Sequence, residues 1–231
     1  MNFFDSLIGD IYSIVKEKKA VGYSFDKDVQ WNDTGYSQVI LQRDTAFELE
    51  GTGFNLVTSK PLNDEIIVVG DDLDKISKSR NFVRVSFIQI EDEEDQQKAY
   101  NLIRKIEYVK YHTFPEGYMM RTASRSHKEA VRVAKSAVKK GISFQKVGSL
   151  FINKYKEIPA VKAVTVMFIT DTSADYPAFS QLASKSNTIT EALNHVMNSV
   201  NFDCDTCNLK AVCDEVEGMK ELHFKTASKG M

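Results

Sequence analysis

The sequence predicts an α+β fold, close to α/β, in which one central mixed β-sheet is flanked by helices. Helical and strand-like apolar patterns alternate along the chain, which favours a single layered sheet. Two β-branched runs, at 65–70 and 163–171, give the strongest strand signals. We find no internal repeat. We therefore expect an α+β domain over residues 1–200 and a C-terminal cysteine-rich metal-binding module over residues 201–231.

The first quarter of the chain predicts one helix followed by short strands. Apolar residues in 2–18 recur at spacings of three and four, and lysines follow at the C-terminal end, as in an amphipathic helix. Residues 20–60 predict short strands and turns, with Gly51 and Gly53 as breaks between apolar pieces. The unbroken run at 65–70 then predicts a strand that is buried on both faces.

The next stretch predicts a strand, a long helix and a short strand. Residues 83–90 alternate with period two, which predicts a strand with one exposed face. The acidic block 91–95 opens a helix through about Lys110, because carboxylates in a first turn complement the helix dipole. Tyr118–Arg121 predicts a short strand after a turn at Pro115–Gly117.

Residues 125–140 predict the most polarised helix of the chain, ended by Gly141. Basic residues recur at spacings of three and four, so that they share one face. These residues are Arg125, Lys128, Arg132, Lys135 and Lys139. Such a stripe either meets phosphates or an acidic partner, or is only a solvated helix face.

The last part of the domain predicts two helices around the strongest strand. Residues 147–155 predict a helix that Pro159 ends, and 163–171 predicts the strand. The segment 171–185 predicts a loop or a short helix, and 189–200 a further short helix.

Composition limits the class of protein. The 231 residues carry 30 Lys and Arg against 32 Asp and Glu, a net charge of −2, which argues against a general nucleic-acid binder. No apolar run is long enough to span a membrane. The first residues lack the basic and apolar regions of a signal peptide. We therefore expect a soluble, cytoplasmic protein without nucleic-acid or membrane partners.

Three cysteines, the only ones in the chain, form the pattern C-x2-C-x5-C at Cys204, Cys207 and Cys213. Thiolates at this spacing suit a [4Fe–4S] cluster or zinc, and the other readings are a Cys204–Cys207 disulfide with a spare thiol or three unliganded thiols. Both metal centres need a fourth ligand, for which His195 and His223 are candidates. Each histidine can instead simply pack or face solvent.

Several ordered segments resemble the middle domain of acetyl-CoA synthase, the β subunit of the CO dehydrogenase/acetyl-CoA synthase complex. The resemblance covers roughly residues 45–213. The segments are AFELE (46–50), DEIIVVGDDLDKI (64–76), VRVSFIQI (83–90), SRSHKEA (124–130), GISFQKVGSLFINKYK (141–156) and AVTVMFITD (163–171).

The resemblance implies a cluster-binding segment at the cysteines. Cys204 and Cys207 match the first pair of cubane ligands of the family, and Cys213 matches the third at a shorter spacing. A fourth cubane cysteine and the Cys-Gly-Cys that carries nickel in the family do not occur before Met231. We therefore expect a truncated relative without the nickel site, and we assign no catalytic residue.

The resemblance also implies partners and a ligand. CO dehydrogenase and corrinoid protein subunits are the expected partners. Arg125 and Lys128 match an Arg-x-x-Lys segment of the family that helps to receive CoA, and Arg121 lies close to them in sequence. We expect weak CoA or phosphate binding at these three residues, supported by the first turn of the predicted basic helix.

These observations lead to two hypotheses. The first is a metal-binding protein of CO and acetyl-CoA metabolism that carries a [4Fe–4S] cluster and acts as an accessory, electron-transfer or interaction module. The alternative is a zinc-stabilised, non-catalytic interaction module.

Overall fold

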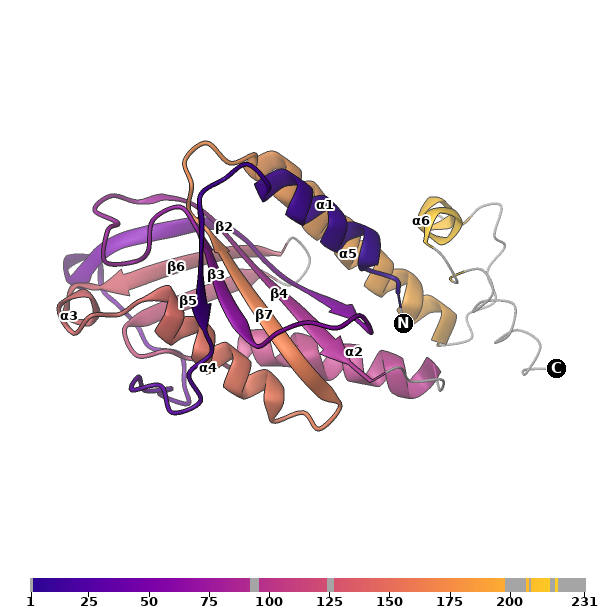
Figure 1. The fold of residues 1–231 in the computed structure, drawn as a ribbon, viewed down its shortest axis with the longest axis horizontal. Coiled ribbons are helices and arrows are strands. Elements are labelled where there is room, and N and C mark those ends of the chain that lie inside the picture. The colour runs from indigo at the N-terminus through magenta and orange to yellow at the C-terminus, as the bar shows by residue number, and fades with distance from the viewer. Residues whose placement is uncertain are drawn as a thin grey trace.

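A mixed sheet of seven strands lies between two pairs of helices in the computed structural model (Figure 1). The structure describes residues 2–91, 96–123, 127–197, 207, 209–216 and 219. The strands are β1 (Ala20–Ser24), β2 (Thr45–Thr58), β3 (Glu65–Val69), β4 (Arg80–Ile90), β5 (Tyr118–Ala123), β6 (Lys128–Ala134) and β7 (Val161–Ile169). The helices are α1 (Asp5–Val15), α2 (Gln96–Tyr111), α3 (Lys135–Lys139), α4 (Phe144–Lys156), α5 (Tyr176–Met197) and α6 (Lys210–Glu215), with a 3₁₀ turn at Gln42–Asp44.

The strand order is β1-β3-β7-β4-β2-β6-β5. Pairs β3–β7 and β4–β2 are parallel, and the other four pairs are antiparallel. Helices α1 and α5 cover one face of the sheet, and α2 and α4 cover the other (Figure 1). The predicted α+β class, with a central mixed sheet flanked by helices, is confirmed.

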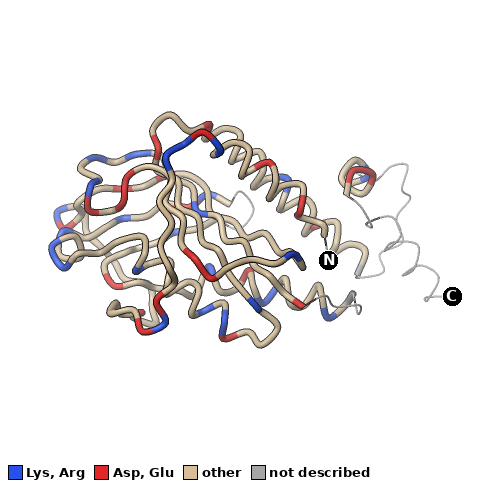
Figure 2. The backbone as a smooth tube through the Cα atoms, viewed as in Figure 1, with Lys and Arg blue, Asp and Glu red and all other residues tan. Residues whose placement is uncertain are grey.

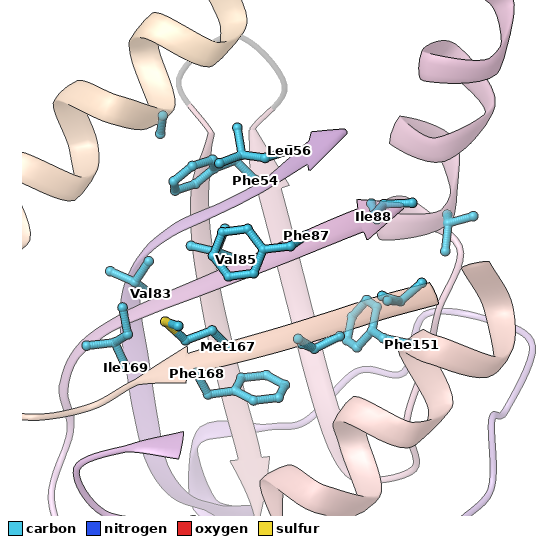
Figure 3. Packing of buried hydrophobic residues seen from close by; sticks show 14 of the residues in the cluster. Phe54, Leu56, Val83, Val85, Phe87, Ile88, Phe151, Met167, Phe168 and Ile169 are labelled. Atoms are coloured by element: carbon cyan, nitrogen blue, oxygen red, sulfur yellow. The ribbon is translucent and has the colours of Figure 1, made fainter. Parts of the chain in front are cut away.

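The core is built around β4 and β7, which pair in the middle of the sheet. Figure 3 shows apolar side chains of β2, β4 and β7 packed side by side, with Phe151 of α4 beside them. Both faces of β4 are buried from Val83 to Ile88, including Arg84 and Ser86. The prediction of an exposed face for residues 83–90 was therefore wrong, because the polar side chains of this face are buried with polar partners.

Strand β2 is one strand of 14 residues rather than several short pieces. The glycines that suggested breaks lie inside it. A Cβ at Gly51 would lie 1.7 Å from the carbonyl oxygen of Phe82 on β4, and a Cβ at Gly53 would lie 1.9 Å from Oε2 of Glu129 on β6. Glycine inside a strand often marks such a close approach. The two glycines therefore permit tight packing instead of ending a strand.

A buried ion pair crosses β2 at Gly53. Arg84 on β4 donates from Nε to Oε1 of Glu129 on β6 at 3.0 Å, and from a terminal nitrogen to Oε2 at 2.7 Å. Both side chains are 0% exposed. The guanidinium also donates to Ser86 at 3.1 Å and lies over the ring of Phe151, 4.5 Å from its centre. The pair thus joins two strands that are not neighbours.

The predicted basic helix at 125–140 was wrong over most of its length, because residues 128–134 form strand β6 and only Lys135–Lys139 is helical. Val131 and Val133 point into the core at period two, while Lys128 and Arg132 point away from it. Residues 128–134 therefore also fit the period-two pattern of a strand, and pairing with β2 and β5 stabilises this strand.

Downstream of β7, α5 is one helix of 22 residues where a loop and a short helix were expected. Pro177 suggested a loop, but it lies in the first turn of α5. Backbone N–H groups in a first turn have no acceptor within the helix, so a proline there, which lacks the N–H, removes no hydrogen bond. The predicted helices at 2–18 and 147–155 correspond to α1 and α4, and the strands at 65–70, 118–121 and 163–171 to β3, β5 and β7. The expected acidic start of α2 falls on residues 92–95, outside the described residues.

No helix in the described part of the chain combines the length and apolar composition needed to cross a bilayer. Figure 2 shows basic and acidic residues interspersed along the chain rather than gathered into one extended basic face.

The buried ion pair gives a stability prediction. Glu129→Gln removes one partner and leaves the Arg84 charge buried without a carboxylate, so we expect a loss of about 3–5 kcal/mol of unfolding free energy in urea titrations. Glu48→Gln is the matched control, since Glu48 of β2 pairs with Arg132 of β6 at 2.5 Å but is partly exposed. That variant should lose less than about 1 kcal/mol. Equal losses in the two variants would contradict the expectation that breaking the buried pair costs more stability than breaking the partly exposed one.

Candidate functional site

The described cysteines lie where a short helix packs onto the end of the main fold. Cys207 precedes α6 and Cys213 lies within it. Both side chains are half-buried and pack against the hydrophobic core. Around them Leu209, Val216 and Met219 are buried, and α6 packs on α5.

An ion pair also holds this segment in place, since Lys185 of α5 contacts Glu215 of α6 at 2.8 Å. The segment that carries Cys207 and Cys213 is therefore attached to the domain by apolar packing and by an ion pair. The division into a domain over 1–200 and a module over 201–231 stays a prediction.

Two of the three cysteines lie in the described part of the chain. Neither Cys207 nor Cys213 forms a disulfide within the described residues. Cys204 and His223 lie outside those residues, while His195 lies in the last turn of α5 and is half-buried. In the described part of the chain no three His, Cys, Asp or Glu side chains gather into a metal-binding group. The ligand set of Cys204, Cys207, Cys213 and one histidine therefore stays a prediction.

The predicted phosphate-binding residues Arg121 and Lys128 do share one surface feature, which we call the β6 groove. This cavity of about 700 Å³ lies between the β2–β6–β5 part of the sheet and α5. Its lining includes Glu50 and Thr52 of β2, Arg121 and Ala123 of β5, Lys128 and Ala130 of β6, and Ser180 and Ser184 of α5. Arg125 lies outside the described residues.

Strand pairing, and not a helix, brings the two cations together. Arg121 pairs with Ala130, and Lys128 pairs with Ala123 across β5 and β6. The expected helix N-terminus at these residues is absent from the structure, because Lys128 begins a strand. The groove therefore offers two exposed cations, a floor with small side chains and the hydroxyls of α5. Two carboxylates also belong to the lining: Glu50 opposes the cations, while the charge of Glu129 is compensated by Arg84. Such a surface suits a phosphate group held by charge-assisted hydrogen bonds.

Behind the groove, a buried polar cluster fixes the start of β6. His127 is 6% exposed and has a left-handed backbone with φ of 47°. Its Nδ1 lies 3.1 Å from Nζ of Lys110, which is fully buried and contacts Glu107 at 2.8 Å. The carbonyl oxygen of His127 accepts a hydrogen bond from N–H of Gly53 at 2.9 Å. His127, which directly precedes β6, is thus held by α2 through its side chain and by β2 through its carbonyl oxygen.

Burial, and after it the positive charge of Lys110, lower the pKa of His127 to about 4. The imidazole is therefore neutral near neutral pH, and its Nδ1 accepts from the Lys110 ammonium. Sequence reasoning missed this cluster and the Arg84–Glu129 pair. The signal for Arg84 was present, since a basic residue inside an otherwise apolar strand requires a buried partner.

A family model described as the CO dehydrogenase/acetyl-CoA synthase complex beta subunit matches residues 34–174. The matched part is more than half of the 231 residues, and it runs from the segment before β2 to the segment between β7 and α5. It contains Arg121, Lys128 and the buried cluster, whereas α5 and the cysteines follow it. No curated protein matches the chain significantly.

The neutral, buried His127 predicts a pH dependence of stability. Between about pH 4 and pH 6.5 the unfolded chain binds a proton at this residue that the folded chain does not, so stability falls as pH falls through this range. The full loss is about 3 kcal/mol. Urea titrations across the range should show that His127→Asn, which tolerates the left-handed backbone, lacks this part of the slope.

His112→Asn is the control, because the His112 side chain is exposed. It should keep the pH dependence of the wild type. The interpretation fails if the His127→Asn protein has the same slope between pH 4 and pH 6.5 as the unsubstituted protein.

Proposed function

The chain belongs to the family of CO dehydrogenase/acetyl-CoA synthase complex beta subunits, and from this membership we propose that it carries a [4Fe–4S] cluster on Cys204, Cys207 and Cys213. Its proposed role is that of an accessory, electron-transfer or interaction module in CO and acetyl-CoA metabolism. The observation that carries the proposal is the C-x2-C-x5-C spacing of the three cysteines.

The surroundings of the described thiols support this assignment. Cys207 and Cys213 are half-buried, lie beside α6 and form no disulfide within the described residues. Thiolates are the usual ligands of iron–sulfur clusters, and partial shielding from water is one of the factors that tune a cluster's potential. His223 or His195 is the proposed fourth ligand. A bound cluster supplies one-electron transfer.

The role as an accessory module follows from the assignment of ligands. All three cysteines of residues 1–231 are used for the cluster, which leaves no thiol among these residues for a separate nickel site. We therefore assign no catalytic residue. CO dehydrogenase or corrinoid protein subunits are the proposed partners, in line with the family's description as one subunit of a complex.

A structural zinc ion is the second candidate for the same ligands. Three cysteines and one histidine form a common zinc-binding set. The packing of α6 against α5 favours a structural role, because a metal there would help to hold a short helix onto the domain. The chain would then be a zinc-stabilised, non-catalytic interaction module.

The β6 groove is the proposed site of weak CoA binding. CoA carries a pyrophosphate and a 3′-phosphate, and Arg121 and Lys128 are exposed at one groove. Arg binds phosphate oxygens through two parallel hydrogen bonds, while Lys adds a mobile point charge. Arg125 precedes Lys128 by three residues and is the proposed third cation.

Metal analysis of anaerobically purified protein tests the cluster. We expect brown protein with about four irons per chain and bound sulfide, and a loss of most of the iron in Cys207→Ser and Cys213→Ser. Comparing His223→Ala with His195→Ala identifies the fourth ligand through a changed spectrum of the reduced cluster. His112→Ala is the control and should keep both iron and spectrum.

Two other outcomes decide against the cluster. Colourless protein with about one zinc per chain would establish the zinc module instead. Protein without stoichiometric metal would contradict both assignments.

Calorimetric titration of CoA tests the β6 groove. Replacing Arg121 and Lys128 together by alanine removes two charge-assisted contacts, so binding should weaken by about 3 kcal/mol, on the order of a hundredfold. Arg43→Ala with Lys135→Ala is the matched control, since both are exposed cations that do not line the groove. Equal affinity in all three proteins, or no heat from any, would rule out this site.

A further inference from the structure

We propose that the groove between α2 and α4 docks an acidic segment of a partner protein, one that presents carboxylates around an apolar side chain. The groove has a volume of about 480 Å³. Its lining comes from α2 and from the end of α4, the helices that cover the face of the sheet opposite α1 and α5 (Figure 1). The lining contains neither Cys207 nor Cys213 and shares no residue with the β6 groove. The proposal therefore does not depend on the cluster or on CoA binding.

The charges that line this groove are mostly positive. Arg104 and Lys105 come from α2, Lys154 comes from α4, and Glu157 is the one carboxylate among the lining residues. Neither Arg104 nor Lys105 has a carboxylate partner among the described residues, although Arg104 donates to the hydroxyl of Tyr100 at 3.1 Å. The wall formed by α2 thus presents two cations whose charge the described fold does not balance.

Lys154 gives the opposite wall a fixed charge. Its Nζ lies 3.0 Å from a carboxylate oxygen of Glu157 and 3.9 Å from one of Asp33. These contacts hold the side chain in place and leave it partly exposed. A carboxylate that enters the groove therefore meets the cations of α2 on one side, whereas Lys154 on the other side is oriented by carboxylates that already compensate its charge.

An exposed aromatic ring lies beside these cations. Tyr108 is 60% exposed, and its ring stacks on the imidazole of His112 with 3.4 Å between ring centres. The stack restrains the ring, so that little rotamer freedom remains to be lost on binding. Tyr and Arg are among the residues that most often carry binding energy in protein interfaces. Val109 and Ile158 add an apolar floor.

The spacing of the cations favours a peptide over a phosphate ligand. A phosphate group needs cations and N–H donors that converge at one point. Here the cations lie on two helices, Lys154 is already paired, and the groove follows the C-terminal half of α2 rather than its N-terminal turn. Separate carboxylates along a chain, with an apolar side chain against Tyr108, fit this arrangement better.

Fluorescence anisotropy with two labelled peptides, EEFLEE and its uncharged counterpart QQFLQQ, tests the proposal. We expect the acidic peptide to bind at least about tenfold more tightly, with an affinity that falls between about 50 and 200 mM salt. Arg104→Glu with Lys105→Glu should weaken binding of the acidic peptide by at least about tenfold. Tyr108→Ala should weaken it about fivefold with the salt dependence retained.

The control variant combines Lys16→Glu with Lys19→Glu. It makes the same change in net charge at exposed lysines near the end of α1, on the other face of the sheet. It should change affinity by less than about twofold, because screening limits charges this remote. Circular dichroism of each variant checks the fold, and the comparison of the two peptides needs no variant.

Four outcomes would overturn the proposal. The first is no binding, and the second is equal weakening by both charge-reversal variants, which means general attraction. The third is tight binding of inorganic pyrophosphate that depends on Arg104 and Lys105, which assigns the groove to a phosphate ligand. The fourth is a concentration-dependent dimer in sedimentation that the Arg104→Glu, Lys105→Glu variant abolishes, which assigns it to a contact between copies of this chain.

Discussion

The buried ion pair between Arg84 and Glu129 is the constraint on which much of the structure depends. It reaches across β2 from β4 to β6, so that the strand between them needs glycine at position 53. An ion pair without access to water is stable only when its geometry and remaining hydrogen bonds are good. Two bonds between the partners and a further bond to Ser86 meet that condition.

The same ion pair fixes which side chains of β6 face outward. Because side chains alternate along a strand, burial of Glu129 directs Lys128 and Ala130 to the opposite face. The carbonyl of His127, bonded to Gly53, fixes where that strand begins. Lys128 of the β6 groove therefore owes its position to polar contacts in the interior of the domain.

The sequence predicted the fold well wherever one periodicity was dominant, as in α1, α4, β3 and β7. It failed at β6, where basic residues four apart fit a helix while Val131 and Val133 fit a strand, and only pairing with β2 decides between them. At the candidate sites, the cysteine spacing and the choice of Arg121 and Lys128 as neighbouring cations came from the sequence, whereas the strand pairing that brings these two cations together did not. The contact between Lys110 and His127 could not be read from the sequence, because it joins the end of a helix to the start of a strand and depends on how the two pack.

Helix α5 links the two proposed sites through neighbouring residues, since Ser184 lines the β6 groove and Lys185 pairs with α6. Each residue of an α-helix advances the chain by about 1.5 Å and turns it by about 100°. Removing or adding one residue within α5 would therefore rotate all that follows and misdirect it, whereas many exchanges of exposed side chains would leave the helix path unchanged. In relatives that share this arrangement, evolution should tolerate substitutions in α5 more readily than changes in its length.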